Sequence, residues 1–307
     1  MGLKWPPETV LGEEAIESWQ QPGSNCILDF HGDPLKADLA VFSDGNHHMA
    51  LLPALKAFHG AHPRINGIFY ATTPPYPISQ LLRNGALRLG NLTLAVRPHV
   101  FISPPHVLAQ LKREGFVGGA TPLARNRGSA LLVPRGNPEN ITVIRDLLRD
   151  DLRLFISNPQ TEQVSYRGYR ETLEAAARWE GLEKGVLDRS VFGNTVVYGA
   201  CIHHREAPEA VAAGRADAAI VYYHLALRYT RIFPDSFEMV ALDQMEGAPD
   251  PWPAELTAEI HMGCIDDGGP WGELFLDFMQ SDIAAQIYAR HGLQHIRDID
   301  PINVRGE

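Results

Sequence analysis

Two pairs of adjacent histidines lie where an apolar segment gives way to a helical pattern, one pair in each half of the chain. His47 and His48 follow the run Leu39–Phe42, and His203 and His204 follow Val196–Tyr198. The first turn of a helix has N–H groups without intrahelical partners and carries the positive end of the helix dipole. Such positions bind anions, and an imidazole beside them can donate a hydrogen bond or ligate a metal ion. Both pairs are therefore predicted to contact a small ligand.

The elements that position these histidines alternate between apolar, β-rich runs and helical patterns. Strands are expected at 39–42, 65–70, 87–96, 100–103, 130–133, 152–157, 196–198 and 218–223. Helices are expected at 49–59, 78–84, 105–114, 142–148, 163–179 and 207–213, with two more between 272 and 293. This alternation predicts an α/β fold with mainly parallel sheets.

Length and composition narrow the class of protein. The chain has 307 residues, which is long for one hydrophobic core and suits two domains. Its formal net charge of -10 argues against nonspecific binding of nucleic acid, which needs a basic face. Cys26, Cys201 and Cys264 are odd in number and far apart, so buried reduced thiols are expected rather than disulfides or a metal site.

Motifs that would indicate an enzyme are missing from the sequence. There is no Gly-x-Gly-x-x-Gly after a strand, no Gly-Lys-Ser/Thr loop, no Gly-x-Ser-x-Gly and no His-Glu-x-x-His. No run approaches the roughly 18 apolar residues that a membrane span requires, and the first residues contain no apolar signal-peptide segment. A protein without enzymatic activity, without a cofactor and without a membrane span is expected.

Six segments, taken in order over residues 38–296, resemble the molybdate- and tungstate-binding proteins of ABC transporters. They are the strand, loop and helix at 42–58, the βα unit at 80–117, the segment 124–141, the run 154–161, the run 212–222, and the closing helices at 275–293. The resemblance implies a type 2 periplasmic-binding-protein fold, in which two α/β lobes are joined by two crossover strands and close on a ligand by a hinge motion.

The resemblance also implies domain boundaries and partners. Lobe 1 would comprise residues 36–125 and 230–307, lobe 2 residues 126–229, and residues 1–35 would form an N-terminal extension packed on lobe 1. We expect a monomer that binds a small inorganic ion and delivers it to an ABC transporter permease. The family implies a periplasmic or otherwise extracytoplasmic location, whereas the lack of a signal peptide leaves a cytoplasmic location open.

The ligand contacts implied by the family fall on loops that differ here from the family pattern. By position they are Asn46, His47 and His48 before the first helix, Thr72 and Thr73 after the second strand, Glu162 within 161–165, His203 with His204, and Tyr222 with Tyr223. The family usually has small hydroxyl residues at the first and fourth of these places. Here Asn46 stands at the first and His203 at the fourth.

These residue types leave the sign of the ligand open. An oxyanion would be held by helix N–H groups, Asn46, threonine hydroxyls and histidine N–H groups, and this interpretation is preferred. A divalent transition metal would instead take His48 and His203 as neutral ligands, with Glu162 or a tyrosine completing the shell. A small organic acid, an intracellular sensor of a ligand, and an enzyme with a histidine general base are the remaining alternatives.

Overall fold

The computed structural model describes residues 29–298 apart from 90, 201, 243–252 and 254–255, and it divides into two compact units. The described parts of Pro7–Arg125 and Glu259–Glu307 form lobe 1, and those of Asn126–Ala258 form lobe 2. The chain therefore passes into lobe 2 after Arg125 and leaves it after Ala258.

The return to lobe 1 comes later than the expected position after residue 229. β12 (Phe237–Ala241) pairs antiparallel with β8 (Ser129–Pro134) along its whole length, so it belongs to the sheet of lobe 2. Of the expected N-terminal extension, residues 1–28 lie outside the described part of the chain. Asp29–His31 form β1, which pairs antiparallel with β3 (Ile68–Thr72) at an edge of the lobe 1 sheet.

Lobe 1 is built on a seven-stranded mixed sheet of order β1-β3-β2-β6-β13-β7-β14. β2 runs parallel to β3 and β6, whereas the other neighbouring strands pair antiparallel. The remaining strands are β2 (Leu39–Ser43), β6 (Val100–Ser103), β7 (Thr121–Arg125), β13 (Glu259–Cys264) and β14 (Gln294–His295). The sheet is thus mixed rather than mainly parallel.

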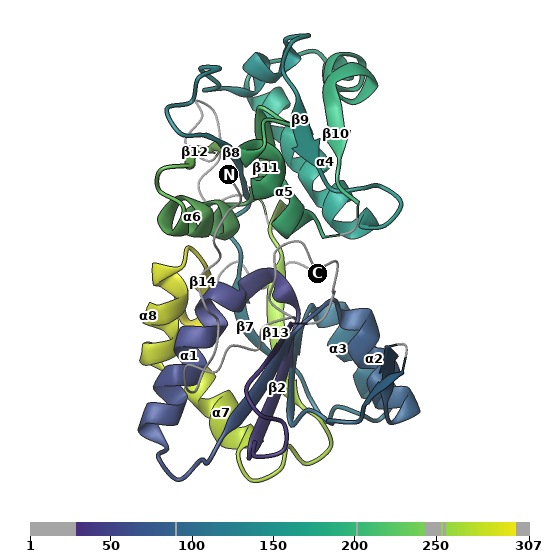
Figure 1. Ribbon diagram of the computed structural model, residues 1–307, viewed down its shortest axis with the longest axis vertical. Coiled ribbons are helices and arrows are strands. Elements are labelled where there is room, and N and C mark those ends of the chain that lie inside the picture. Colours follow the sequence, from purple (N-terminus) through teal and green to yellow (C-terminus); the bar gives the residue numbers. More distant parts are fainter. Residues whose placement is uncertain (1–28, 90, 201, 243–252, 254–255, 299–307) are drawn as a thin grey trace. The chain divides into compact units, whose positions relative to one another are not determined.

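Helices cover both faces of this sheet (Figure 1). Successive side chains of a strand point to opposite faces, so Leu39 and Val41 pack in one core while Ala40 and Phe42 pack in another. The first core is closed by α1 (His48–Ala61), α7 (Gly272–Met279) and α8 (Asp282–Arg290), and the second by α2 (Pro75–Asn84) and α3 (Pro105–Arg113).

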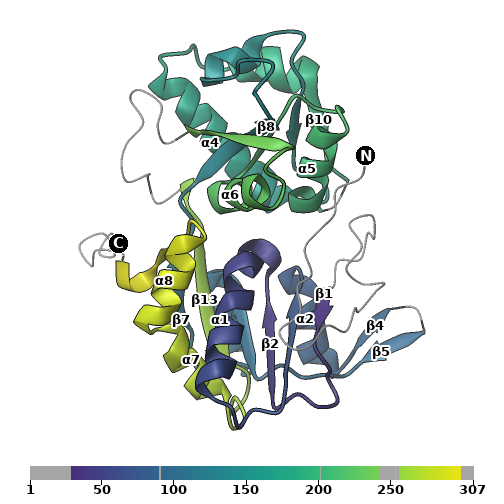
Figure 2. The ribbon, with the colours of Figure 1, turned by 60° about the vertical axis from the view of Figure 1, so that its left-hand side comes forward.

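The single strand expected at 87–96 is a two-stranded antiparallel ribbon, β4 (Leu87–Leu89) and β5 (Leu92–Leu94), which follows α2 (Figure 2). Two short 3-10 helices complete lobe 1, η1 (Gly45–His47) before α1 and η6 (Ile296–Asp298) after β14.

Lobe 2 has a five-stranded mixed sheet of order β10-β9-β11-β8-β12, in which β9 (Leu154–Ile156), β10 (Val196–Tyr198) and β11 (Ala218–Tyr222) are parallel. Leu154 and Ile156 pack in a core with α4 (Gln163–Trp179), the 3-10 helix η2 (Ile144–Leu148) and the π-helix η3 (Asp188–Thr195). Phe155 points the opposite way and contacts α5 (His203–Ala212), which lies beside α6 (Tyr223–Ile232).

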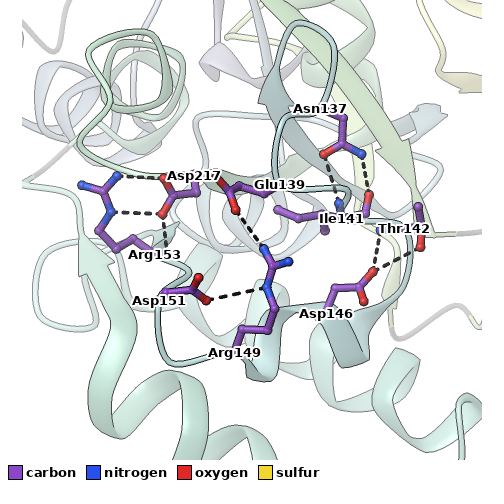
Figure 3. A network of polar contacts seen from close by, with 9 residues as sticks. All are labelled: Asn137, Glu139, Ile141, Thr142, Asp146, Arg149, Asp151, Arg153 and Asp217. Carbon is purple, nitrogen blue, oxygen red and sulfur yellow. Dashed lines mark hydrogen bonds and ion pairs between the residues drawn. The ribbon is translucent and has the colours of Figure 1, made fainter.

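A network of polar contacts fixes the edge of lobe 2 at which the parallel strands begin (Figure 3). Arg153, just before β9, donates from Nη2 and Nε to the two carboxylate oxygens of Asp217, just before β11, at 2.7 and 3.0 Å. Arg149 contacts Glu139 at 3.1 Å nearby. These charged pairs hold the amino ends of β9 and β11 together.

The α/β fold predicted from the sequence is confirmed. Within the described ranges no helix has the length and apolar character needed to span a membrane.

Candidate functional site

In lobe 1, the parallel strands β3, β2 and β6 end side by side in hydroxyl residues. Ser43 lies opposite Thr72 in the register, and the N–H of Thr73 donates to the carbonyl oxygen of Ser43 at 2.9 Å. Ser103 ends β6, and we call Ser43, Thr72, Thr73 and Ser103 the hydroxyl row. All four are buried, and the hydroxyls of Thr73 and Ser103 have no hydrogen-bond partner among the described residues. A buried hydroxyl without a partner costs free energy, so these two groups are suited to donating to a bound ligand.

The first histidine pair follows Ser43 in the chain, with His47 at the end of η1 and His48 at the start of α1. Asp44 caps η1 by accepting from the N–H of Asn46 at 3.2 Å. Burial raises the pKa of Asp44 to about 6, and the hydrogen bond from Asn46 opposes this rise. Asn46 itself is half-buried. The N–H of Asn46 is therefore committed to the Asp44 cap.

His47 points into lobe 1. Its Nε2 lies 2.7 Å from Ser43 Oγ and its Nδ1 lies 2.9 Å from the hydroxyl of Tyr288 on α8. Ser43 Oγ also donates to the carbonyl oxygen of Asp44 at 2.9 Å. Because Ser43 has one proton, a consistent network has Nε2–H donating to Ser43 and the Tyr288 hydroxyl donating to Nδ1. The structure thus gives His47 a structural role in place of the predicted ligand contact.

His48 is half-buried at the start of α1. Its Nδ1 lies 2.7 Å from the carbonyl oxygen of Gly45, so Nδ1 carries the proton and Nε2 is an acceptor in the neutral ring. An acceptor nitrogen suits a metal ion or a ligand hydroxyl better than an ionised oxygen. The predicted donation from His48 to an oxyanion therefore requires the charged imidazole.

The loop after β3 supplies hydroxyls and few N–H groups. α2 begins at Pro75, and Pro77 stands two residues later, so two of its first three residues have no N–H to donate. At this place, Thr72 and Thr73 are the groups through which lobe 1 can donate hydrogen bonds. Thr72 Oγ1 lies 3.4 Å from Asp29 Oδ2, which makes Thr73 the less committed of the two.

In lobe 2, the three parallel strands also end at one edge. Ser157 follows β9, Gly199 follows β10, and Tyr222 ends β11 opposite Ser129 of β8. The hydroxyls of Ser157 and Ser129 are buried and have no partner in the part of the chain that the structure describes. A second group of unsatisfied hydroxyls therefore marks the corresponding edge of lobe 2.

His203 begins α5 at the same edge. Its ring is 2% exposed and lies between Phe155 and Tyr169, with centroid distances of 5.6 and 4.8 Å. Neither ring nitrogen has a partner among the residues described. Burial lowers the pKa of His203 to about 3, so the ring is neutral at physiological pH. It can donate one hydrogen bond and accept another without bringing a charge.

Two carboxylates cap the start of α5. Glu162 accepts from the N–H of His203 through both carboxylate oxygens, at 3.0 and 3.2 Å. Glu206 accepts from the N–H groups of Ala200 at 2.5 Å and Ile202 at 3.0 Å. Burial raises the pKa of Glu162 and the charge of Glu206 adds to the rise, whereas the hydrogen bond from His203 opposes it. The first turn of α5 is therefore already occupied by negative charge, which the sequence analysis did not anticipate.

The other predicted residues of lobe 2 are spread along α5, β11 and α6. The ring of Tyr222 packs at a tilt against that of Tyr169, with centroids 5.0 Å apart, and Tyr169 in turn contacts the ring of His203. His204 is half-buried, and its carbonyl oxygen accepts from the hydroxyl of Tyr229. Tyr223 lies under the guanidinium of Arg127 at 5.1 Å from its ring centroid. The structure thus joins Glu162, His203 and Tyr222 through contacts within lobe 2 and directs Tyr223 elsewhere.

A metal centre has no support in the described ranges, where no three His, Cys, Asp or Glu side chains lie together in a group that could hold a metal ion.

A protein-family model described as bacterial extracellular solute-binding protein matches residues 39–294. The chain belongs to this family. The match spans both lobes and the hydroxyl row. No curated protein matches the chain.

Solved structures with the same fold include other solute-binding proteins, all with low sequence identity. PEB3 of Campylobacter jejuni with bound L-phospholactate has a TM-score of 0.58 and 16% identity, covering 83% of this chain and 99% of that one. The periplasmic molybdate-binding protein of Azotobacter vinelandii has a TM-score of 0.55 and 17% identity, covering 83% and 98%. The sulfate-binding protein SubI of Mycobacterium tuberculosis has a TM-score of 0.59 and 15% identity, covering 86% and 88%. These likenesses confirm the type 2 two-lobed fold.

Three serines at the strand ends of this solute-binding protein are candidate site residues that the sequence did not predict. Ser43, Ser103 and Ser157 each follow a phenylalanine-containing apolar strand directly, in the runs Val-Phe-Ser, Phe-Ile-Ser and Phe-Ile-Ser. A polar residue at the carboxyl end of a buried parallel strand is a recognisable signal, since ligands of open α/β sheets bind beyond these ends.

Proposed function

We propose that this solute-binding protein captures a small oxyanion of the molybdate or tungstate class and delivers it to an ABC transporter permease outside the cytoplasm. The observation that carries the proposal is the pair of buried, unpartnered hydroxyls of Thr73 and Ser103 in the hydroxyl row. Four further groups at the corresponding edge of lobe 2 support it, namely Ser157, Ser129 and the two ring nitrogens of His203.

The chemistry of these groups favours an oxyanion. Hydroxyls and a neutral imidazole are uncharged donors, and several of them can surround an oxygen-rich anion without the cost of burying a lysine or arginine. Such a set is compatible with a chain whose net charge is -10. Hydroxyl and imidazole donors are also indifferent to the central atom of the anion, so size and protonation would decide between molybdate, sulfate and phosphate.

The metal alternative rests on His48 and His203, and no cluster of ligating side chains in the described ranges accompanies either residue. The enzyme alternative is disfavoured by the His47 network. Ser43 and His47 are hydrogen-bonded in the manner of a nucleophile and its base, but both are fully buried and their protons are committed to neighbours.

A thermal-shift screen of dialysed, chelator-treated protein tests the proposal. The ligands are molybdate, tungstate, sulfate, phosphate, zinc, nickel and copper. A ligand at one hundred times its dissociation constant adds about 2.7 kcal/mol to the stability of the folded state, which gives a readily measured shift. Stabilisation by molybdate or tungstate, confirmed by calorimetry, is the expected result. Stabilisation by a divalent metal with no response to any oxyanion would overturn the proposal.

A further inference from the structure

The carboxylate of Glu162 occupies the position at the start of α5 where the helix would hold an external anion. Its two oxygens lie 3.0 and 3.2 Å from the N–H of His203, the first residue of the helix. Glu162 comes from the loop that precedes α4, and its own helix receives no cap from its side chain. The side chain therefore serves a neighbouring helix, in the way that a bound carboxylate ligand would.

Buried polar groups without hydrogen-bond partners accompany this carboxylate at the start of α5. The ring of His203 is 2% exposed with both nitrogens unpartnered among the described residues, and the hydroxyl of Ser157 is fully buried and unpartnered at the end of β9. Glu162 contacts the backbone N–H of His203 and forms no hydrogen bond with these groups. The carboxylate of Glu162 thus accepts from the N–H of His203, whereas the ring of His203 and the hydroxyl of Ser157 can still donate to a ligand.

The loop that carries Glu162 is tied to the α5 side of the site. Thr161 Oγ1 donates to the carbonyl oxygen of Ala200 at 2.6 Å, and Asn158 Nδ2 donates to the carbonyl oxygen of Gly199 at 2.9 Å. These bonds keep Glu162 beside the helix start. A ligand that approaches the start of α5 therefore meets the negative charge of Glu162, which the hydrogen bonds of Asn158 and Thr161 hold in place.

We propose that Glu162 is a built-in competitor that weakens, without abolishing, the binding of fully ionised oxyanions at the start of α5 relative to oxyanions that carry a proton. A dianion without a proton must displace the carboxylate or remain beside its charge. A ligand that carries a proton, such as monohydrogen phosphate, can donate to Glu162 and keep the helix capped. This inference rests on the proposed function, because it assumes that an oxyanion binds in lobe 2.

Calorimetric titrations of wild type, Glu162→Gln and Glu162→Ala test the inference. The probes are molybdate, which is fully ionised, and inorganic phosphate at pH 7.5, which carries a proton. Glutamine keeps the size of the side chain and removes its charge, whereas alanine also frees the His203 N–H. Both variants are expected to bind molybdate about tenfold more tightly, the effect of one charge-assisted interaction, and to bind phosphate no more tightly than wild type does. Glu209→Gln, on the same helix but away from its start, is the control and should leave both affinities unchanged.

The outcomes separate this inference from the proposed function. If wild type binds oxyanions and Glu162→Gln binds molybdate no more tightly, the inference is overturned and the proposed function stands. If Glu162→Gln gains affinity for molybdate and phosphate equally, the effect is general charge repulsion and the selection of a protonated ligand is overturned. If molybdate binds to the variants alone, the competing role is supported and molybdate is overturned as the ligand of the wild-type protein. If no protein in the series binds any oxyanion, both proposals fall.

Discussion

The Nε2 atom of His47 lies 2.7 Å from the Oγ atom of Ser43, at the place where β2 gives way to η1 and α1. The same ring reaches Tyr288 of α8 through Nδ1 at 2.9 Å. One imidazole therefore joins the end of a central strand to Tyr288 of α8, which lies 241 residues later in the chain. It also holds one member of the hydroxyl row in a fixed rotamer.

The His47 network should contribute substantially to the stability of lobe 1. His47→Ala leaves Ser43 and the buried hydroxyl of Tyr288 without their partner and opens a cavity, so we expect the free energy of unfolding to fall by about 2–4 kcal/mol. Urea unfolding measures the change. His106→Ala, on the exposed side of α3, is the control and should cost less than about 0.5 kcal/mol. A His47→Ala protein as stable as this control would show that the network is energetically unimportant.

Asp44 should make the stability of the protein depend on pH between about 4 and 7. Burial raises the pKa of Asp44 to about 6 in the folded state, above the value of 3.8 for the free side chain. The folded protein therefore holds a proton that the unfolded chain has lost in this range, and stability falls as the pH rises. Two pKa units correspond to about 3 kcal/mol.

Asp44→Asn tests this dependence. The amide keeps an acceptor for the N–H of Asn46 and cannot ionise, so the variant should lose less stability than wild type between pH 4.5 and pH 7.5. Urea unfolding at the two pH values gives the comparison. Parallel losses in both proteins would mean that another group causes the pH dependence.

The Arg153–Asp217 pair should act on stability in the opposite direction with pH. The hydrogen bonds from Arg153 lower the pKa of Asp217 below its usual value. A lowered carboxyl pKa contributes stability above the pKa of the unfolded chain, and this contribution is lost as the pH falls through the folded value. Both side chains are partly exposed, so we expect Asp217→Asn to cost about 1 kcal/mol at pH 7 and almost nothing near pH 2.

Asp151→Asn is the matched control for that pair, because Asp151 is 79% exposed and lies 3.8 Å from Arg149. It should change the free energy of unfolding by less than about 0.5 kcal/mol. Equal effects of the two substitutions would contradict a special contribution from the bidentate contact shown in Figure 3.

The sequence predicted the α/β class because the apolar alternation of strands such as Leu39–Ser43 reports their two buried faces directly. It did not predict which ring of each histidine pair turns inward. His47 meets Tyr288 and the N–H of His203 meets Glu162, contacts between residues 241 and 41 positions apart. No local pattern encodes such pairs, since they depend on how separate elements pack.

The end of lobe 2 was predicted at residue 229, whereas the structure places it after Ala258, for a related reason. β12 has a moderately apolar sequence that would suit either lobe, and its place is decided by five residue pairs with β8, more than one hundred positions earlier. The serines at the strand ends, by contrast, were within reach of sequence reasoning. Their positions follow from the strand pattern alone, and a search for polar residues at each strand end would have found Ser43, Ser103 and Ser157.

His203 should affect ligand affinity without affecting stability when its ring shape is kept. His203→Phe preserves the aromatic contacts with Phe155 and Tyr169 and removes both ring nitrogens. Because those nitrogens are buried without partners, their loss should not lower stability, whereas oxyanion affinity should fall about tenfold. Titration calorimetry and urea unfolding give the two values. An unchanged affinity would remove His203 from the site.

In lobe 1, loss of the Thr73 hydroxyl should likewise lower ligand affinity without lowering stability. Thr73→Val replaces a buried, unpartnered hydroxyl by a methyl group of similar size, so the free energy of unfolding of the ligand-free protein should stay the same or rise. Affinity for the oxyanion should fall about tenfold, because one donor is lost. Thr172→Val is the matched control, since Thr172 is equally buried but donates to the carbonyl oxygen of Gly168 at 2.9 Å within α4. That variant should lose stability and keep its affinity, so a Thr73→Val protein that behaves like Thr172→Val would show that the hydroxyl row is structural and that the ligand binds elsewhere.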